Sequence, residues 1–282
     1  MERIEGQLVD QEQLAKQVLS WITYARRPLT TTELQHALGV EVGKSQLDED
    51  NIPQVEDMVS VCAGLVTVDK EGVIIRLVHY TTQEYFDGTR ENWFPNTEAD
   101  IMTICVTYLS FDKFEMGICY NDEEFEERLR SNRLYNYASH NWGHHAREAS
   151  TLTPEVISFL KRQAQAEASS QALLAVKRYS SHSNYSQKFP RQMKGIHLAA
   201  YFGITKAVQL LLSSNRLDLN DSYGGTPLLW AAMNGHEAIV KLLLAIGKID
   251  ADVEDICGQT PLSYAAVNRH KVIVKLLSEH TN

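Results

Sequence analysis

The sequence predicts a mainly α-helical protein that carries one short β-hairpin and ends in a stack of helical repeats. Three observations predict this fold. Apolar residues recur at helical spacing along most of the 282-residue chain. Around Gly72, two short segments rich in β-branched residues flank a turn instead. A helix–turn–helix pattern, best formed at Asp221 to Leu244, recurs near the C-terminal end.

The composition is that of an ordinary soluble protein and argues against several classes of function. A net charge of −9 disfavours broad affinity for nucleic acid or an anionic membrane. No segment has the length of a membrane span, and the first residues lack the apolar core of a signal peptide. The four cysteines are scattered without CxxC spacing, which favours reduced thiols. We therefore expect a cytoplasmic protein with no nucleic-acid or membrane partner.

Residues 1–96 contain three helical patterns followed by a hairpin. The helical patterns cover Gln11 to Arg26, Thr31 to Leu38 and roughly Pro53 to Val61. The hairpin pairs Leu65 to Asp69 with Val73 to His79 around the turn Lys70-Glu71-Gly72. Three helices followed by a two-stranded wing is the order of elements in a winged-helix domain.

A winged helix often binds DNA, so the composition of its third helix matters. That helix, NIPQVEDMVSVCAGL, has two acids and no Lys or Arg, and the turn of the wing has Lys70 next to Glu71. A helix that reads a groove needs donors for phosphates and base edges. DNA recognition is therefore the least favoured of three functional hypotheses.

Residues 97–190 read as a helical bridging domain and linker. Before it, Thr81 to Glu84 resembles a capping box for a helix that runs to about Phe86. The expected helices of the bridging domain are Ala99 to Leu109, Asp122 to Arg130, Leu134 to Arg147, one that starts at Thr153-Pro154, and one around Ser169 to Lys177. Tyr179 to Gln187 lacks periodicity and is expected to be a linker or loop.

Residues 191–282 contain three repeated units. Segments that begin at Lys194, Thr226 and Thr260 align, with spacings of 32 residues (226 − 194) and 34 residues (260 − 226). Thr-Pro starts a helix, and Asn234-Gly235 ends it because glycine adopts the left-handed conformation of a tight reversal. The TPLHxAA-like pattern at this period resembles ankyrin repeats. The first unit has Lys194-Gly195 in place of Thr-Pro, so we expect it to lean on the preceding helices.

The ankyrin resemblance implies that a protein partner binds at the turns and at the concave face of the first helices. The candidate contact residues are Tyr223, Trp230, Met233, Tyr264 and Asn268. Exposed aromatic residues are common binding hot spots. Trp230 has an alternative role in the repeat core, which the sequence leaves open.

The segment LVHYTTQEYF, from Leu77 to Phe86, is followed by a helical block that contains YASHNWGHHAR. This order resembles the region behind the NACHT module of fungal NLR-like proteins, which are STAND signalling ATPases. No Walker A loop, Walker B strand or sensor arginine precedes the wing, so the chain looks like the C-terminal part of such a protein or a shortened relative. By this resemblance His79 contacts the phosphate of a nucleotide bound by a NACHT module in trans or upstream. The alternative is a histidine that fixes the strand–helix corner.

Two further patterns resemble sites but have ordinary structural explanations. Gly39 to Ser45 has three residues between its glycines, where a phosphate-binding P-loop has four, and it follows a helix. His140 and His144 are four residues apart next to His145, but no cysteine lies nearby in sequence. We expect a loop in the first case and helix packing in the second. No catalytic residue, metal site or cofactor is expected.

The first hypothesis is therefore a non-catalytic protein–protein interaction or regulatory module that uses the ankyrin-repeat surface. The alternative is the regulatory and sensor half of a STAND ATPase whose nucleotide-binding module is absent from this chain.

Overall fold

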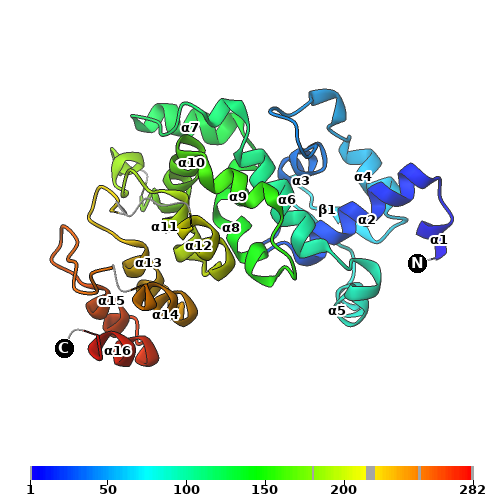
Figure 1. Cartoon of the computed structure of the whole chain (residues 1–282). Coiled ribbons are helices and arrows are strands. Elements are labelled where there is room, and N and C mark those ends of the chain that lie inside the picture. The colour runs from blue at the N-terminus through cyan, green and yellow to red at the C-terminus, as the bar shows by residue number, and fades with distance from the viewer. Residues whose placement is uncertain (1, 180, 214–219, 247–248, 281–282) are drawn as a thin grey trace.

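The computed structural model describes residues 2–179, 181–213, 220–246 and 249–280. Its elements follow one another from the N-terminal to the C-terminal end of an elongated molecule (Figure 1). Nearly all of them are helices, and two strands form the sheet of the described part. The mainly α fold class is therefore confirmed. Met1 and Asn282, the outer limits of the expected first and last domains, lie outside the described residues.

The N-terminal elements have the predicted winged-helix order. They are α1 (Glu2–Glu5), α2 (Val9–Tyr24), α3 (Thr31–Leu38), the 3-10 helix η1 (Glu49–Asn51), α4 (Val55–Val61), β1 (Val66–Val68) and β2 (Ile75–Leu77). A capping box starts α3: Thr30 Oγ1 accepts the N–H of Glu33, and the Glu33 carboxylate accepts the N–H of Thr30. The strands are antiparallel, with Val66 opposite Leu77 and Val68 opposite Ile75.

The helix after the wing is longer than the sequence predicted. α5 covers Tyr80–Trp93, so it begins before Thr81 and continues well past Phe86. Phe86 is buried and packs against Phe94, with ring centroids 5.3 Å apart. This contact with the segment after the helix stabilises the additional turns. The capping motif at Thr81 to Glu84 indicates only where a helix starts, so it could not predict how far α5 extends.

The helical block follows with α6 (Thr97–Leu109), η2 (Asp112–Phe114), α7 (Asp122–Ser131), α8 (Tyr135–Glu148), α9 (Pro154–Lys161) and α10 (Gln163–Leu174). The expected helix at Ser169 to Lys177 was misplaced, because α10 begins at Gln163 and ends at Leu174. Its first turn, QAQA, has no large apolar side chain, so apolar periodicity does not indicate its start. Gln171 on α10 is buried and bonds the backbone of Cys119 in both directions.

The expected linker is partly docked on the helical block. A 3-10 helix, η3 (Tyr185–Gln187), places Tyr185 and Ser186 in buried positions. The Tyr185 hydroxyl donates to Glu126 at 2.7 Å, and the Ser186 hydroxyl donates to Asp122 at 2.6 Å. Both acceptors lie on α7, so hydrogen bonds to that helix hold this segment in place. Ser180, within the same stretch, lies outside the described residues.

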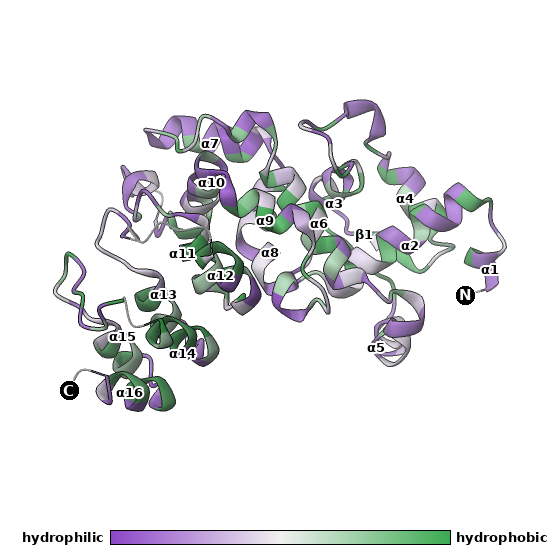
Figure 2. Cartoon of the chain, viewed as in Figure 1, coloured by the Kyte–Doolittle hydropathy of each residue, from purple (hydrophilic) through white to green (hydrophobic). Residues whose placement is uncertain are grey.

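The three repeats are three helix pairs: α11 (Gly195–Phe202) with α12 (Thr205–Leu212), α13 (Pro227–Met233) with α14 (Glu237–Ala245), and α15 (Pro261–Val267) with α16 (Lys271–Ser278). Thr226 and Thr260 cap α13 and α15 through their side chains, and proline occupies the first position of each helix. Figure 2 shows that the repeat helices are largely hydrophobic, whereas α7 is mostly hydrophilic.

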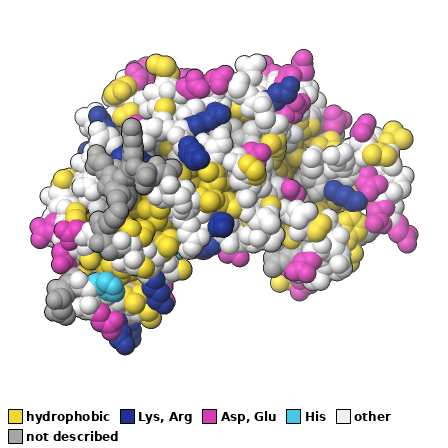
Figure 3. Space-filling view, in the orientation of Figure 1, with side chains coloured by type: hydrophobic (Ala, Val, Ile, Leu, Met, Phe, Trp, Pro, Cys, Tyr) yellow, Lys and Arg dark blue, Asp and Glu magenta, His cyan; other side chains and the backbone are white. Residues whose placement is uncertain are grey.

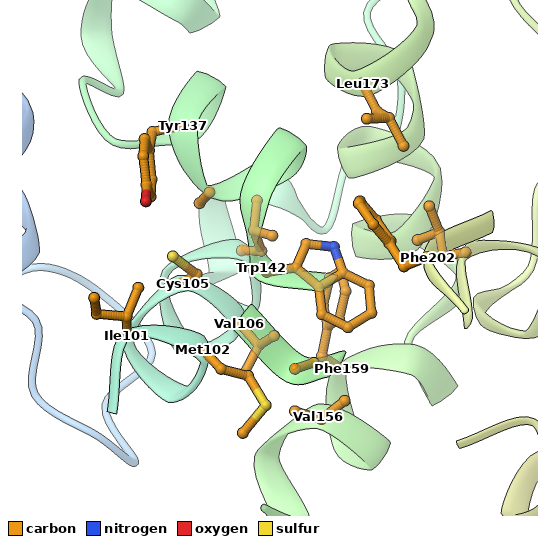
Figure 4. Packing of buried hydrophobic residues seen from close by; sticks show 14 of the residues in the cluster. Ile101, Met102, Cys105, Val106, Tyr137, Trp142, Val156, Phe159, Leu173 and Phe202 are labelled. Carbon is orange, nitrogen blue, oxygen red and sulfur yellow. The ribbon is translucent and has the colours of Figure 1, made fainter. Parts of the chain in front are cut away.

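The first repeat packs directly on the helical block, as expected from its atypical start. Trp142 of α8 lies between Phe159 of α9 and Phe202 of α11, with centroid distances of 5.5 and 5.0 Å (Figure 4). A Cβ added at Gly143 would lie 2.0 Å from the Phe202 ring, and one at Gly195 would lie 2.0 Å from the Leu160 carbonyl. Glycine is therefore needed at both close approaches. The division into residues 1–96, 97–190 and 191–282 stays a prediction.

Candidate functional site

The turn before α13 is organised by one buried aspartate. Asp221 Oδ1 accepts the N–H groups of Tyr223 and Gly225 at 2.8 and 2.9 Å. Its other oxygen, Oδ2, accepts the indole N–H of Trp230 at 2.9 Å. The carboxylate thus ties the turn to the inner helix of its own repeat. These hydrogen bonds from the aspartate to its own turn stabilise one conformation of the turn.

The same arrangement recurs one repeat later. Asp255 Oδ1 accepts the N–H groups of Cys257 and Gln259 at 2.8 and 2.9 Å, and Oδ2 accepts the hydroxyl of Tyr264 at 2.7 Å. Partial burial alone would raise the pKa of Asp255, but the hydrogen bonds from Tyr264 and the backbone lower it below its usual range. Burial and the carboxylate together raise the pKa of Tyr264 to about 12.

The tips of successive turns, called here the fingertips, are joined by backbone hydrogen bonds. Ser222 N–H donates to the Arg191 carbonyl at 2.8 Å, and Ile256 N–H donates to the Tyr223 carbonyl at 2.8 Å. The row exposes two apolar side chains, Tyr223 at 36% and Ile256 at 66%. Ile256 was not among the predicted contact residues. Its signal in the sequence is a single large apolar residue within the polar turn EDICGQ.

The predicted contact residues differ in how far they are exposed to solvent. Trp230 is only 6% exposed and packs beside Tyr201, so its position supports the alternative role in the core. Met233 is half-buried, and its carbonyl accepts the side-chain amide of Asn268 at 3.1 Å. Met233 and Asn268 therefore meet at the ends of the inner helices. Tyr223 lies at the fingertips, and half-buried Tyr264 is tied to the fingertip turn that carries Ile256.

Two histidines connect neighbouring repeats at the start of the outer helices. His236 Nε2 contacts the Tyr201 carbonyl at 2.9 Å, and His270 Nε2 contacts the Met233 carbonyl at 3.1 Å. A Cβ at Gly235, which has a φ of +80°, would lie 2.7 Å from the His270 ring. The glycine thus serves both the left-handed turn and the close approach of the next repeat.

A cavity of about 460 Å³ lies beside His79, where the wing meets the end of α2. Its polar lining includes Arg26, Arg27, Arg76 and Gln83, and none of the described residues that line it is Asp or Glu. The His79 side chain is exposed, and its backbone carbonyl accepts the N–H of Thr82. A cavity with an apolar floor and basic side chains around it suits an organic anion.

The arginines of this cavity also bond inward. Arg26 Nη2 contacts both oxygens of Glu98 at 3.1 and 3.2 Å, and Arg27 Nη1 donates to Glu33 at 2.8 Å. Glu98 on α6 also bonds the buried His145 of α8, whose other ring nitrogen lies 2.9 Å from the Tyr137 hydroxyl. Burial lowers the pKa of His145, and Glu98 opposes this shift. The network connects the winged-helix elements to the helical block.

The three histidines of α8 have different surroundings. His140 Nδ1 contacts the Asn136 carbonyl, His144 packs edge-on against Phe202, and His145 belongs to the Glu98 network. No group of three or more potential metal ligands occurs among residues whose placement the structure describes. His144 and His145 therefore contact other helices, whereas His140 bonds the backbone of its own helix.

The outer face of α4 is acidic. Glu56 and Asp57 are exposed there, whereas Met58 is buried against the core. The helix that would enter a DNA groove in a DNA-binding winged helix thus presents carboxylates to solvent.

No helix of the described chain is both long enough and apolar enough to span a bilayer.

Comparisons with known proteins match both ends of the chain. A family model described as "GPI inositol-deacylase, winged helix domain" matches residues 2–92, and one described as "Ankyrin repeats (3 copies)" matches residues 168–282. A segment of 53 residues is 47% identical to the "Calmodulin-binding transcription activator CBT" of Oryza sativa subsp. japonica, covering 18% of this chain and 6% of that protein. The chain therefore combines a winged-helix domain of the GPI inositol-deacylase type, which is NACHT-associated, with three ankyrin repeats.

Proposed function

We propose that this chain is a non-catalytic interaction or regulatory module that binds a protein partner through its ankyrin-repeat surface. The observation that supports this most directly is the row of fingertips at Arg191, Ser222–Tyr223 and Ile256. Hydrogen bonds hold the row in shape, so binding costs little conformational entropy. Tyr223 and Ile256 supply exposed apolar contacts of the kind that form hot spots.

The contact residues divide into two groups in this proposal. Tyr223, Tyr264, Met233 and Asn268 touch the partner, because each has side-chain surface open to solvent. Trp230 acts from beneath the surface. By bonding Asp221, it fixes the turn that presents Tyr223.

The test is affinity capture from a cell extract with the full-length chain and a Tyr223→Ser, Ile256→Ser double variant. We expect the double variant to lose at least one protein that the unmodified chain retains. A Met116→Ser, Tyr120→Ser double variant is the matched control, since it removes two exposed apolar side chains from the helical block. If both double variants retain every protein that the unmodified chain captures, the proposal is wrong.

The regulatory half of a STAND ATPase is the second candidate. The observation in its favour is the cavity in which His79 joins Arg26, Arg27 and Arg76. Arg26 and Arg27 are partly neutralised by Glu98 and Glu33, which leaves His79 and Arg76 for the phosphate of a nucleotide held by another module. This sensor role rests on the resemblance of Leu77 to Phe86 to NACHT-associated sequences.

A nucleotide-release measurement tests this second role. A NACHT module expressed separately is loaded with a fluorescent nucleoside diphosphate and mixed with this chain. We expect the chain to slow release, and His79→Ala to remove part of that effect while Val78→Ala, at a neighbouring exposed position that does not line the cavity, leaves it intact. Equal release with and without the chain would exclude the sensor role.

The third candidate, DNA binding, has the least support because the outer face of α4 carries Glu56 and Asp57. A titration of duplex DNA at low salt decides it, since phosphate contacts give salt-dependent binding. We expect no change in the binding signal as DNA is added.

A cytoplasmic location also stays a proposal, and fluorescence microscopy of a tagged full-length chain tests it.

A further inference from the structure

A second cavity, of about 250 Å³, lies where the α3–α4 loop meets the helical block. Its lining comes from three places: Gly43, Lys44 and Ser45 of the loop, Thr107 and Ser110 at the end of α6, and Pro154, Glu155, Ser158 and Arg162 of α9 and the residue after it. The backbone joins the loop to the block here, because Asp112 N–H donates to the Ser45 carbonyl at 2.9 Å. This cavity is separate from both sites described above.

The cavity has the electrostatic character of an anion site. Lys44 and Arg162 are the two cations of its lining, and Glu155 is its single carboxylate among described residues. Lys44 also lies 3.9 Å from the carboxylate of Glu41, an exposed residue of the same loop, which offsets part of its charge. Arg162 Nη1 donates to the Ser110 carbonyl at 3.0 Å, which holds the guanidinium at the cavity. A helix N-terminus adds partial positive charge, since α9 begins at Pro154. The Thr153 side chain makes no capping bond to this helix and lies 3.2 Å from the Thr103 hydroxyl.

A second, independent observation is an unpaired hydroxyl. Thr107 lines the cavity, its residue is only 5% exposed, and its Oγ1, itself almost inaccessible to solvent, has no hydrogen-bond partner among the described residues. Buried hydroxyls in helices usually bond a carbonyl one turn earlier, as Ser170 of α10 does with Ala166 at 2.7 Å. A buried polar group without a partner is unfavourable, and such groups often mark a ligand or ion.

We propose that this cavity binds the dianion of a phosphate group, as inorganic phosphate or as a small phosphate monoester. Lys44 and Arg162 supply the positive charge, and the hydroxyls of Ser45 and Ser158 donate hydrogen bonds to its oxygens. The Thr107 hydroxyl joins them by rotating about its Cα–Cβ bond, because in the free protein its oxygen has almost no surface accessible to solvent. The cavity is several times larger than the roughly 30 Å³ that one water molecule occupies in the liquid, so a tetrahedral anion has room there. Glu155 weakens the binding through like-charge repulsion.

The proposal gives the Gly39 to Ser45 segment a role other than that of a P-loop. In a P-loop, the backbone amides of a loop between a strand and a helix surround the phosphate. This segment instead follows the helix α3, and no helix begins directly after it. Instead, Lys44 and Ser45 face side chains from α6 and α9. A phosphate bound between them connects the winged-helix elements to the helical block.

Isothermal titration calorimetry of the full-length chain with inorganic phosphate and with glycerol 3-phosphate tests the proposal. Lys44→Gln should weaken binding by roughly fivefold or more, because it removes a charge-assisted contact. Lys161→Gln is the matched control, since this exposed lysine neighbours Arg162 but does not line the cavity. Glu155→Gln should tighten binding by roughly threefold, as expected for one like charge at the rim of a solvated site.

Thr107→Val separates a ligand role from a structural one. Because the hydroxyl has no partner among the residues that the structure describes, removing it should leave the melting temperature unchanged or raise it. The same change should weaken phosphate binding. A lower melting temperature with unchanged phosphate affinity would contradict the assignment of Thr107.

The two ligands also identify the source of the phosphate. Tighter binding of inorganic phosphate indicates the free ion, and tighter binding of glycerol 3-phosphate indicates a monoester. Either result supports the proposal if Lys44→Gln weakens it and Lys161→Gln does not. No binding of either ligand at millimolar concentration, or equal affinity in the Lys44→Gln and unmodified chains, overturns the proposal.

Discussion

The indole N–H of Trp230 lies 2.9 Å from Oδ2 of Asp221, and this bond joins the inner helix of the second repeat to its turn. The third repeat makes the equivalent bond with a different donor, the hydroxyl of Tyr264, to Asp255 at 2.7 Å. In both repeats the donor follows the aspartate by nine residues. The aromatic residue at this position therefore serves as a hydrogen-bond donor to the turn as well as a packing group.

Removing either donor should destabilise the repeats. Trp230→Phe deletes the N–H and some volume from a buried site, and we expect a loss of about 2 kcal/mol in the free energy of unfolding. Tyr264→Phe changes little volume at a more exposed site, so we expect about 1 kcal/mol. Urea unfolding followed by circular dichroism measures both. Equal stability of all three proteins would show that these bonds do not stabilise the repeats.

Gly143→Ala should be strongly destabilising, by about 3 kcal/mol or more, because the new Cβ would overlap the ring of Phe202. Thermal unfolding of the full chain measures the effect. Gly88→Ala is the matched control: it lies in the interior of α5, and its Cβ would meet nothing within 4 Å. There we expect a gain of about 0.5–1 kcal/mol from better helix propensity. A small effect at Gly143 would mean that the first repeat does not depend on this packing.

Arg269→Gly should stabilise the third repeat by about 1 kcal/mol. Arg269 has a φ of +64°, at the position where the second repeat has Gly235 with a φ of +80°. A non-glycine residue is strained in this left-handed region, and glycine is not. The converse variant, Gly235→Ala, should be destabilising, because it adds strain and a clash with His270. Differential scanning calorimetry distinguishes the two directions, and a lower melting temperature for Arg269→Gly would refute the argument.

Stability should fall as the pH drops from about 7 to 5, in part through His36. Burial lowers the pKa of His36 to about 4, and the charges of Lys113 and Arg133 act in the same direction. The unfolded chain, with a histidine pKa near 6.5, then binds a proton more readily than the folded chain. The contribution of His36 is therefore complete above about pH 6.5 and is lost as the pH falls toward 4.

The matched variant for this effect is His36→Gln, which removes the titrating ring but keeps a polar side chain near the Tyr108 hydroxyl, 3.3 Å from Nδ1. Between pH 7 and pH 5 the unmodified chain should lose roughly 1 kcal/mol more than the variant, after allowance for partial exposure of the ring. Urea unfolding at the two pH values gives the difference. Parallel losses in both proteins would assign the pH dependence to other groups, such as His145.

Sequence reasoning located most helices because their signals are local. Thr-Pro pairs at Thr226 and Thr260, and the spacing between the repeats, depend on residues a few positions apart. It misplaced α10 and shortened α5, because tertiary contacts support those helices. Gln171 bonds the backbone of Cys119, 52 residues away, and Phe86 packs on Phe94, just beyond the end of α5. Local periodicity carries no record of such contacts.

By itself, the sequence determined the mainly α fold, the wing and the three repeats. Helix caps, turn residues and apolar periodicity each depend on residues within a single element, so they can be recognised without the tertiary structure. Tertiary structure alone decided which candidate residues are available for contact. It buried Trp230 against Asp221 and brought His79 beside Arg26 and Arg27. It also brought Lys44 and Arg162 to the same cavity and left the Thr107 hydroxyl without a partner in the described part of the chain. The physical reason is that burial and charge proximity depend on packing between segments that lie far apart in the chain.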